Sequence, residues 1–309
     1  MVRHRRRLWL PVLMLLLSHS GYASESILQK QANAAISLMT FTVTPDITAS
    51  NLSINDNSSG KTDLLLSQFG GGATLDDEYP IYLEGNVGFS RYDPSFLIRD
   101  EGEGVEIPTR WNTLSVSGGL GWDMRVYSDW VLRPIVNVAL GTVASDIRIA
   151  DWIFDQYRTT DSSFLDSGRL NTFGLGGALM LDYESYSDKQ DIDVEMRYSY
   201  IHLQSFGSTS TVVKGEANAE NLGLYLRRRA PTGLELLSRP LRYVLEGART
   251  EYFGTQRGLL GFNALNSLGL GVEVDSSKYD IWITRTRLVG RYMFGENTSG
   301  YSIGLAVSF

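Results

Sequence analysis

Large apolar residues alternate with small or polar ones along most of the chain. In the last ten residues, GYSIGLAVSF, every second position is large and apolar, and the positions between are Gly, Ser or Ala. The segment DIDVEMRYSY (191–200) alternates in the same way, with charged residues on its second face. Because successive side chains of a strand point to opposite faces, each such segment predicts a β-strand with one apolar face.

About twelve segments of this kind follow one another. Their centres lie near Phe41, Leu66, Gly85, Val116, Val136, Gly177, Met196, Leu224, Leu245, Leu268, Leu288 and Leu305. The segments around Leu66 and Leu245 alternate poorly, so ten strands is the alternative count. No long segment with helical periodicity lies between the predicted strands, which excludes a parallel α/β fold.

Alternation alone leaves open a soluble β-sandwich, but two features favour a transmembrane barrel. The second faces carry charge repeatedly, as at Asp193, Glu195 and Arg197. Aromatic residues also lie near both ends of an apolar face, as at Trp282 and Tyr292. Ten residues at roughly 3.3 Å each, tilted by roughly 40°, span about 25 Å, the height of the apolar band of a membrane barrel. We therefore predict an all-β fold, a transmembrane antiparallel up-and-down β-barrel.

The lengths of the predicted connections support this topology. Long connections are expected on the cell exterior, at 51–62, 91–110, 145–169 and 203–218, and short ones in the periplasm, at 123–129, 184–190 and 275–280. Such asymmetry is typical of outer-membrane barrels. The connection RRRAPTGLELLSR (227–239) is an exception, because it is long for the periplasmic side.

The first residues have the three-part layout of a secretory signal peptide. Four arginines precede the apolar segment LWLPVLMLLL, and small residues end at Ala23. We expect residues 1–23 to be removed, 24–39 to form an N-terminal segment and 40–309 to form the barrel domain. Without residues 1–23 the chain has 24 basic and 35 acidic residues, a net charge of −11, which argues against nucleic-acid binding.

Candidates for catalysis and metal binding are few. The chain has no cysteine, and His202 is the one histidine after the signal peptide. Ser205 lies three residues further along the chain and therefore on the other face of a strand, so the two residues lack nucleophile–base geometry unless a bulge intervenes. The acidic residues of 145–169 show no spaced ligand motif for calcium. We expect no catalytic residue, no cofactor and no metal site.

Charged residues on the second faces of the strands form the main candidate site. Arg285, Arg287 and Arg291 share one face and can neutralise acidic residues of facing strands; selecting anions in an open pore is the alternative. We predict a structural charge network in the barrel interior, made of Asp193, Glu195, Arg197, Glu273, Arg285, Arg287 and Arg291.

The C-terminal segment resembles the assembly signal of bacterial outer-membrane barrels, with Tyr301, Ile303, Leu305, Val307 and Phe309 on its apolar face. The architecture resembles the translocator domain of autotransporters, in which about twelve strands follow a short helix that lies in the pore. Residues 26–39 have helical spacing of apolar residues and are the candidate helix, while an extension of the first strand is the alternative. Glycine and serine on the inner faces would leave room for this helix.

This resemblance implies an integral protein of the outer membrane of a Gram-negative bacterium. A typical autotransporter carries a secreted passenger before its barrel, but here only a few residues separate the signal peptide from the candidate helix. We therefore expect a solitary barrel without a passenger, with a structural, surface-interaction or translocation role and no enzymatic activity. A small porin-like channel and an outer-membrane lipid hydrolase are the alternatives. The expected partners are outer-membrane lipid and lipopolysaccharide, the barrel-insertion machinery through the C-terminal strand, and periplasmic chaperones. We expect a monomer that binds no nucleic acid.

Overall fold

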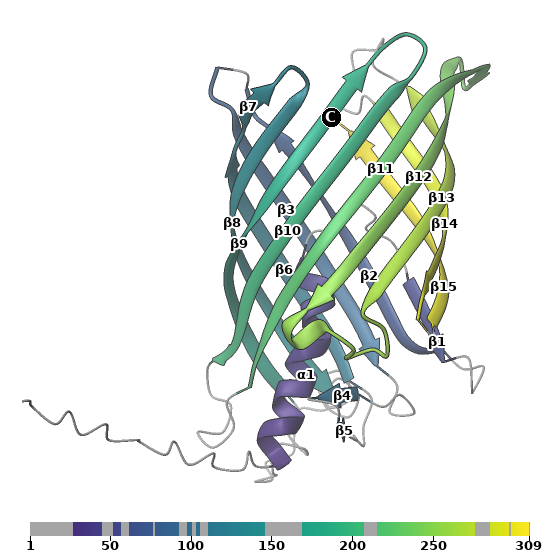
Figure 1. Ribbon diagram of the computed structural model, residues 1–309. Coiled ribbons are helices and arrows are strands. Elements are labelled where there is room, and N and C mark those ends of the chain that lie inside the picture. The colour runs from purple at the N-terminus through teal and green to yellow at the C-terminus, as the bar shows by residue number, and fades with distance from the viewer. Residues whose placement is uncertain are drawn as a thin grey trace, which may run out of the picture.

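The computed structural model describes residues 27–44, 52–56, 62–76, 78–92, 98–100, 103–105, 111–145, 169–206, 215–275, 285–296 and 298–308. These residues form one α-helix inside a closed antiparallel barrel (Figure 1). The elements are α1 (Ile27–Val43), β1 (Leu52–Asp56), β2 (Thr62–Thr74), β3 (Ile81–Tyr92), β4 (Ile98–Asp100), β5 (Glu103–Val105), β6 (Trp111–Trp122), β7 (Met124–Tyr127), β8 (Trp130–Ser145), β9 (Arg169–Tyr186), β10 (Asp191–Phe206), β11 (Glu216–Leu236), β12 (Arg239–Phe253), the short 3-10 helix η1 (Gly254–Gln256), β13 (Ala264–Asp275), β14 (Arg285–Gly295) and β15 (Thr298–Ser308).

Twelve strand positions follow one another around the barrel. The order is β1, β2, β3, β6, β8, β9 and so on to β15, which pairs with β1 and closes the wall. β7 continues β6 and pairs with the same neighbour, β8. β4 and β5 form a separate small hairpin. The predicted fold class, a transmembrane antiparallel barrel of about twelve strands, is confirmed.

The first predicted strand is wrong. Phe41 lies in α1 and not in a strand, and the first strand of the barrel is β1. The segment Thr40–Val43 contains the β-branched and aromatic residues that favour strands, but tertiary contacts override such preferences. Inside the helix, the hydroxyls of Thr40 and Thr42 donate to the carbonyls of Ser37 and Met39, which satisfies both buried side chains.

The alternation sorts side chains to two environments. Leucine and valine on the outward faces are exposed, as at Leu120, Val136 and Leu270. Aromatic residues flank this apolar band at both ends. Trp122 and Tyr127 lie near one rim, and the outward tyrosines and phenylalanines near the other rim are Tyr198, Tyr200, Tyr292, Phe294 and Tyr301. An apolar band between two aromatic rims matches the hydrocarbon core and interfaces of a bilayer.

One connection differs from the prediction. Residues 227–239 are not a long loop, because β11 continues to Leu236 and the turn to β12 contains only Leu237 and Ser238. In its pairing, β11 therefore runs past the first residue of β10, at the end of the barrel where the C-terminus lies (Figure 1). Short turns at this end and long connections at the other identify it as the periplasmic end.

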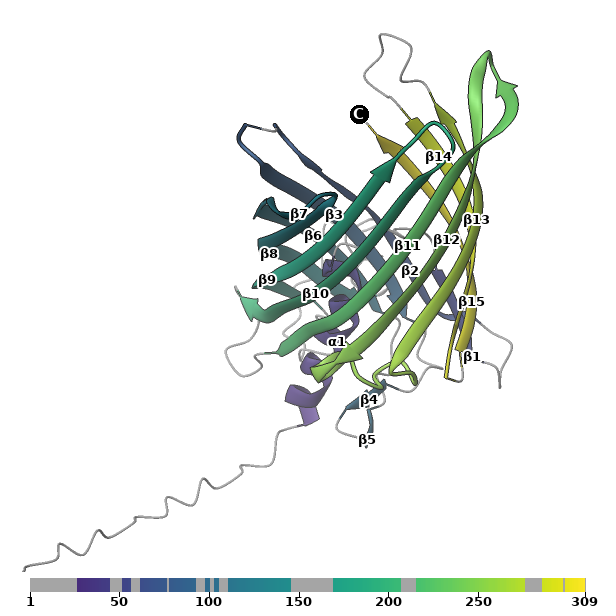
Figure 2. The same ribbon diagram turned by 45° about the horizontal axis from the view of Figure 1, so that its top comes forward.

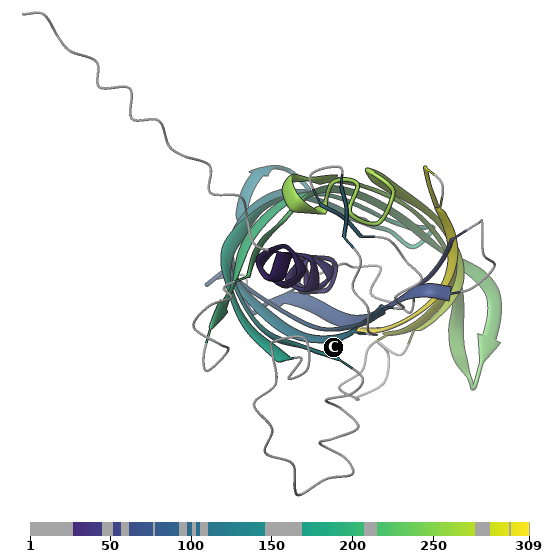
Figure 3. The same cartoon turned by 90° about the horizontal axis from the view of Figure 1, so that it is seen from below.

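The helix lies within the ring of strands and close to one side of it (Figure 3). It contacts β11, β3, β6 and β8 among other strands, and its N-terminal end lies at the exterior opening of the barrel (Figure 1). Residues 26–39 were the candidate helix, and the helix found here is longer, ending at Val43. Among the described residues, no helix combines the length and apolar composition needed to cross a membrane.

Candidate functional site

The last turn of α1 is held by polar side chains of the barrel wall. The final carbonyl groups of a helix have no partner within the helix and need one when they are buried. Here the carbonyls of Thr40, Phe41 and Thr42 accept hydrogen bonds from side chains. The donors are Gln68 of β2, Asn86 of β3, Ser115 of β6 and Gln256 of η1.

The donors of these contacts carry no formal charge. The bond from Asn86 Nδ2 to Thr42 O measures 2.7 Å, and that from Gln256 Nε2 to Thr40 O measures 3.2 Å. Asn86, Ser115 and Gln256 are fully buried. Because the donors come from separate strands and from η1, the end of the helix joins several parts of the wall.

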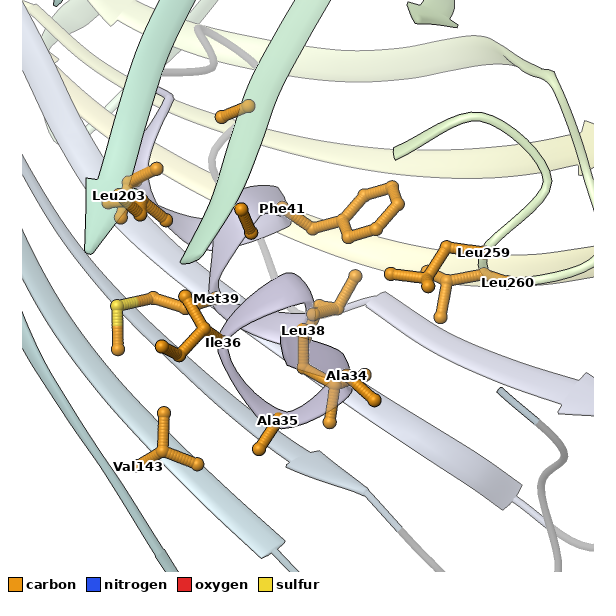
Figure 4. Close-up of a cluster of buried hydrophobic side chains, with 14 of the residues drawn as sticks. Ala34, Ala35, Ile36, Leu38, Met39, Phe41, Val143, Leu203, Leu259 and Leu260 are labelled. Carbon is orange, nitrogen blue, oxygen red and sulfur yellow. The ribbon is translucent and has the colours of Figure 1, made fainter. Parts of the chain in front are cut away.

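An apolar cluster surrounds the middle of the helix (Figure 4). Leu38 and Phe41 of α1 lie in it with Leu259 and Leu260, which follow η1 in the connection from β12 to β13. The ring of Phe41 lies 5.2 Å from that of Tyr252, between centroids. This exterior connection therefore folds into the barrel opening and covers the helix.

Glycines in the wall allow the helix to approach closely. A Cβ atom at Gly88 of β3 would lie 2.5 Å from the carbonyl oxygen of Thr42, and one at Gly141 of β8 would lie 2.5 Å from the sulfur of Met39. Neither position has room for a side chain while the helix is in place. The prediction that small inner residues leave space for a helix agrees with this packing.

A buried ion pair crosses the interior next to the end of the helix. Arg197 of β10 donates two hydrogen bonds of 2.7 Å to the carboxylate of Glu84 of β3, and Asn137 of β8 donates a third of 2.6 Å. Three strands separate β3 from β10 around the wall. Glu84 and Asn86 are successive inward residues of β3, so this ion pair borders directly on the helix contacts.

Further ion pairs lie toward the periplasmic end. Asp191 Oδ2 has three arginines within 4 Å, at 2.9 Å from Arg242, 3.5 Å from Arg229 and 3.7 Å from Arg285. These residues lie on β10, β12, β11 and β14, so a single carboxylate connects four strands. Shared ion pairs of this kind connect several strands from the inside of the barrel.

A second carboxylate, Glu246 of β12, also has several partners. It accepts hydrogen bonds from Arg291 at 2.6 and 2.9 Å and from the hydroxyl of Tyr225 at 2.7 Å. Arg287 lies 3.8 Å from Glu246 and 3.7 Å from Glu273. We call the ion pairs centred on Glu84, Asp191, Asp193, Glu246 and Glu273 the charged layer.

The residues predicted for the charge network all lie on inward faces. Asp193, Arg197, Glu273, Arg285, Arg287 and Arg291 take part in ion pairs, and Glu195 is partly buried on the same face of β10. Arg287 and Glu273 are both predicted members and lie 3.7 Å apart, whereas Arg197 and Arg291 pair with Glu84 and Glu246, which were not predicted.

Several members of the charged layer were not predicted. Glu84, Asp191 and Glu246 lie on the inward parity of their strands, which the alternation could have indicated. Arg227 and Arg229 were assigned to a loop, but both lie in β11, where they pair with Asp193 at 2.8 and 3.3 Å.

His202 lies on the outward face of β10. Its Nδ1 atom is 2.8 Å from Oδ1 of Asn218, the residue opposite it on β11. Ser205 has the other parity, and its hydroxyl accepts a hydrogen bond from the backbone N–H of Gly215. The two side chains are not brought together, as the sequence predicts.

Some predicted features lie outside the described residues. These are residues 1–23, the acidic residues of 145–169, Trp282 and Phe309. Of the proposed assembly signal, Tyr301, Ile303 and Leu305 are exposed on the outward face of β15, and Val307 is placed in β15 by its backbone.

No protein-family model and no curated protein sequence matches the chain. Among the solved structures that are similar to it are two autotransporter domains and LpxR. The β domain of the Bordetella autotransporter BrkA has a TM-score of 0.46 and 15% identity, over 84% of this chain and 96% of that one. LpxR from Salmonella typhimurium has a TM-score of 0.45 and 13% identity, over 84% and 99%.

The translocator domain of the autotransporter NalP from Neisseria meningitidis has a TM-score of 0.41 and 14% identity, over 91% of this chain and 94% of that one. At these values the similarity assigns no function to the chain. The architecture itself, a closed antiparallel barrel with an apolar outer band and a polar interior, is that of outer-membrane proteins of Gram-negative bacteria. The chain is an integral β-barrel of that membrane.

Proposed function

We propose that this protein is a non-enzymatic outer-membrane barrel of the autotransporter-translocator type, in which α1 closes the interior. The observation that carries the proposal is the capping of the last carbonyls of α1 by side chains of three strands and η1. A helix that merely rested in the opening would leave those carbonyls to water. The role proposed for the protein is structural, in surface interaction or in translocation.

A catalytic role gains no support from His202. This side chain is bonded to Asn218 on the outer wall, and the nearest serine along the strand points inward. General-base catalysis requires a nucleophile within hydrogen-bond reach of the histidine. We accordingly expect the His202→Ala variant and the unmodified protein to show the same rate of phospholipid hydrolysis.

The proposal is tested by conductance in planar lipid bilayers. We expect the full chain to pass little current and the variant lacking residues 27–43 to pass clearly more. If the full chain passes as much current as the deletion variant, the helix is not a closure and the porin-like alternative is favoured.

A milder variant avoids the risk that the deletion prevents folding. Asn86→Ala with Ser115→Ala removes both donors to Thr42 O and should raise the frequency of opening. The matched control is Asn266→Ala, which removes a similar bond to the carbonyl of Phe294 on the outer wall. That control should conduct as the unmodified protein does.

A further inference from the structure

The hairpin between β11 and β12 extends beyond the barrel wall. β10 begins at Asp191, which lies opposite Arg229, so the last seven residues of β11 run past the end of that neighbour. Near the tip, Glu235 pairs with Pro240 and Leu236 with Arg239. We call residues 231–240 the hairpin arm.

The hairpin arm leans away from the barrel axis. Figure 2 shows it at the upper right, standing apart from the rest of the wall. Seen from below, it projects outside the ring of strands (Figure 3). The register between Pro231 and Glu235 is irregular and Gly233 has a φ of 78°, so the strand bends where the arm begins. The arm therefore extends sideways over the region that lipid occupies.

Three leucines are exposed on the arm. Leu234 is 65% exposed, Leu236 48% and Leu237 86%. Exposed leucines are expected on the lipid-facing wall, but here they continue past the end of the neighbouring strand β10. Contiguous exposed apolar surface of this kind marks a contact with a membrane or with another protein.

The arm continues the lipid-facing side of the wall. β12 alternates without interruption, so Leu245, Leu241 and Arg239 have the same parity as one another. Leu245 is on the outer wall, and Leu236 lies directly opposite Arg239. Leu236 and Arg239 therefore share a face with the lipid-exposed wall, and Glu235 has the opposite parity.

The turn at the tip has an unusual composition. Leu237 and Ser238 have φ values of 54° and 59°, the left-handed conformation that two-residue hairpin turns require. Asn and Gly are favoured there, and a leucine in this conformation is strained. Leu237 is also not buried against any other described residue, so no packing contact within the described part of the chain offsets this strain. A strained and exposed leucine at a tip indicates a contact outside the molecule.

We propose that the hairpin arm inserts into the periplasmic leaflet of the membrane that holds the barrel. Leu234, Leu236 and Leu237 lie among the upper acyl chains, and Arg239 lies at the level of the lipid phosphates. Leucines beside a basic residue are typical of segments that lie in a bilayer interface. The direction of the arm and its continuity with the lipid-facing wall favour lipid over a soluble protein.

The absence of cysteine in the sequence allows a direct test. Leu237→Cys is labelled with an environment-sensitive fluorophore and placed in nanodiscs of phosphatidylethanolamine and phosphatidylglycerol, which expose both faces of the membrane. We expect blue-shifted emission, strong quenching by spin-labelled lipid and weak quenching by iodide. The control is Lys189→Cys, in the exposed turn between β9 and β10 at the same end, which should show the reverse.

The opposite result is equally clear. If the label at Leu237 is quenched by iodide as strongly as that at Lys189, the arm lies in water and the proposal is wrong. If the label is protected only in discs that hold two barrels, the arm contacts a second copy and the proposal is again wrong. Folding is checked by heat-modifiable migration, and Leu234→Cys replaces Leu237→Cys if the tip variant fails this check.

Discussion

The exterior and periplasmic halves of the barrel interior are filled in different ways. In the exterior half, neutral amides and hydroxyls of the wall bind the carbonyls of a helix that is not part of the wall. In the periplasmic half, arginines and carboxylates of the wall bind one another directly across the interior. The two regions meet at β3, where Asn86 belongs to the first and Glu84 to the second.

This difference means that the helix can leave the interior more easily than the ion pairs of the charged layer can separate. Each neutral hydrogen bond to the helix contributes about 0.5–1.5 kcal/mol net, so a few such bonds can be exchanged for water. Removing one partner of a buried ion pair leaves an uncompensated charge, which is far more costly. We therefore propose that the charged layer stabilises the barrel and that the helix contacts keep it closed.

The largest expected effect comes from breaking the ion pair that crosses the interior. Glu84→Ala leaves Arg197 buried without its carboxylate and should lower the free energy of unfolding by roughly 3–5 kcal/mol. Urea titration of the protein in lipid vesicles measures this change. Glu84→Ala combined with Arg197→Met should recover much of the loss; a double variant no more stable than the single one would contradict the assignment.

A smaller effect is expected where the helix meets the wall. Gly88→Val places a side chain against Thr42 and should displace the end of α1, at a cost of about 1–3 kcal/mol and with higher conductance. Gly85→Val is the matched control on the same strand, because the nearest atom to its Cβ lies 4.0 Å away. Equal conductance of the two variants would show that the helix does not control the current.

The smallest effect is expected for an ion pair outside the barrel. Arg249 and Glu251 form a salt bridge on the outer wall, with their side chains 52% and 38% exposed. Arg249→Ala should change the unfolding free energy by about 0–1 kcal/mol in the same urea titration, because exposed pairs are weak. If Arg249→Ala lowered the free energy of unfolding as much as Glu84→Ala does, burial inside the barrel would not explain the contribution of the charged layer to stability.

The alternation of the sequence predicted the faces of the strands well. It placed Leu120 and Val136 outward and Arg133 and Asn137 inward, because successive side chains of a strand point to opposite faces. It could not predict which inward residues meet. Arg197 and Glu84 are 113 residues apart, and their contact depends on the register of every strand between them and on closure of the ring.

Two local errors have physical reasons as well. Thr40–Val43 has strand-forming composition, and it is helical because the wall supplies partners for its carbonyls. The segment 227–239 looked like a loop because the bulge between Pro231 and Glu235 interrupts its alternation. In the first case the deciding contacts come from residues distant in sequence, which local pattern does not contain.

The pairing of β1 with β15 has a consequence for assembly. Asn55 lies opposite Ser299, so this contact joins the first and last strands of the barrel. Closing so long a segment carries the greatest entropy cost, so we expect this seam to form last. Because α1 comes directly before β1 in the chain, we expect the helix to reach its place before this seam closes. If β1 and β15 paired before α1 had entered, the helix would be left outside the barrel.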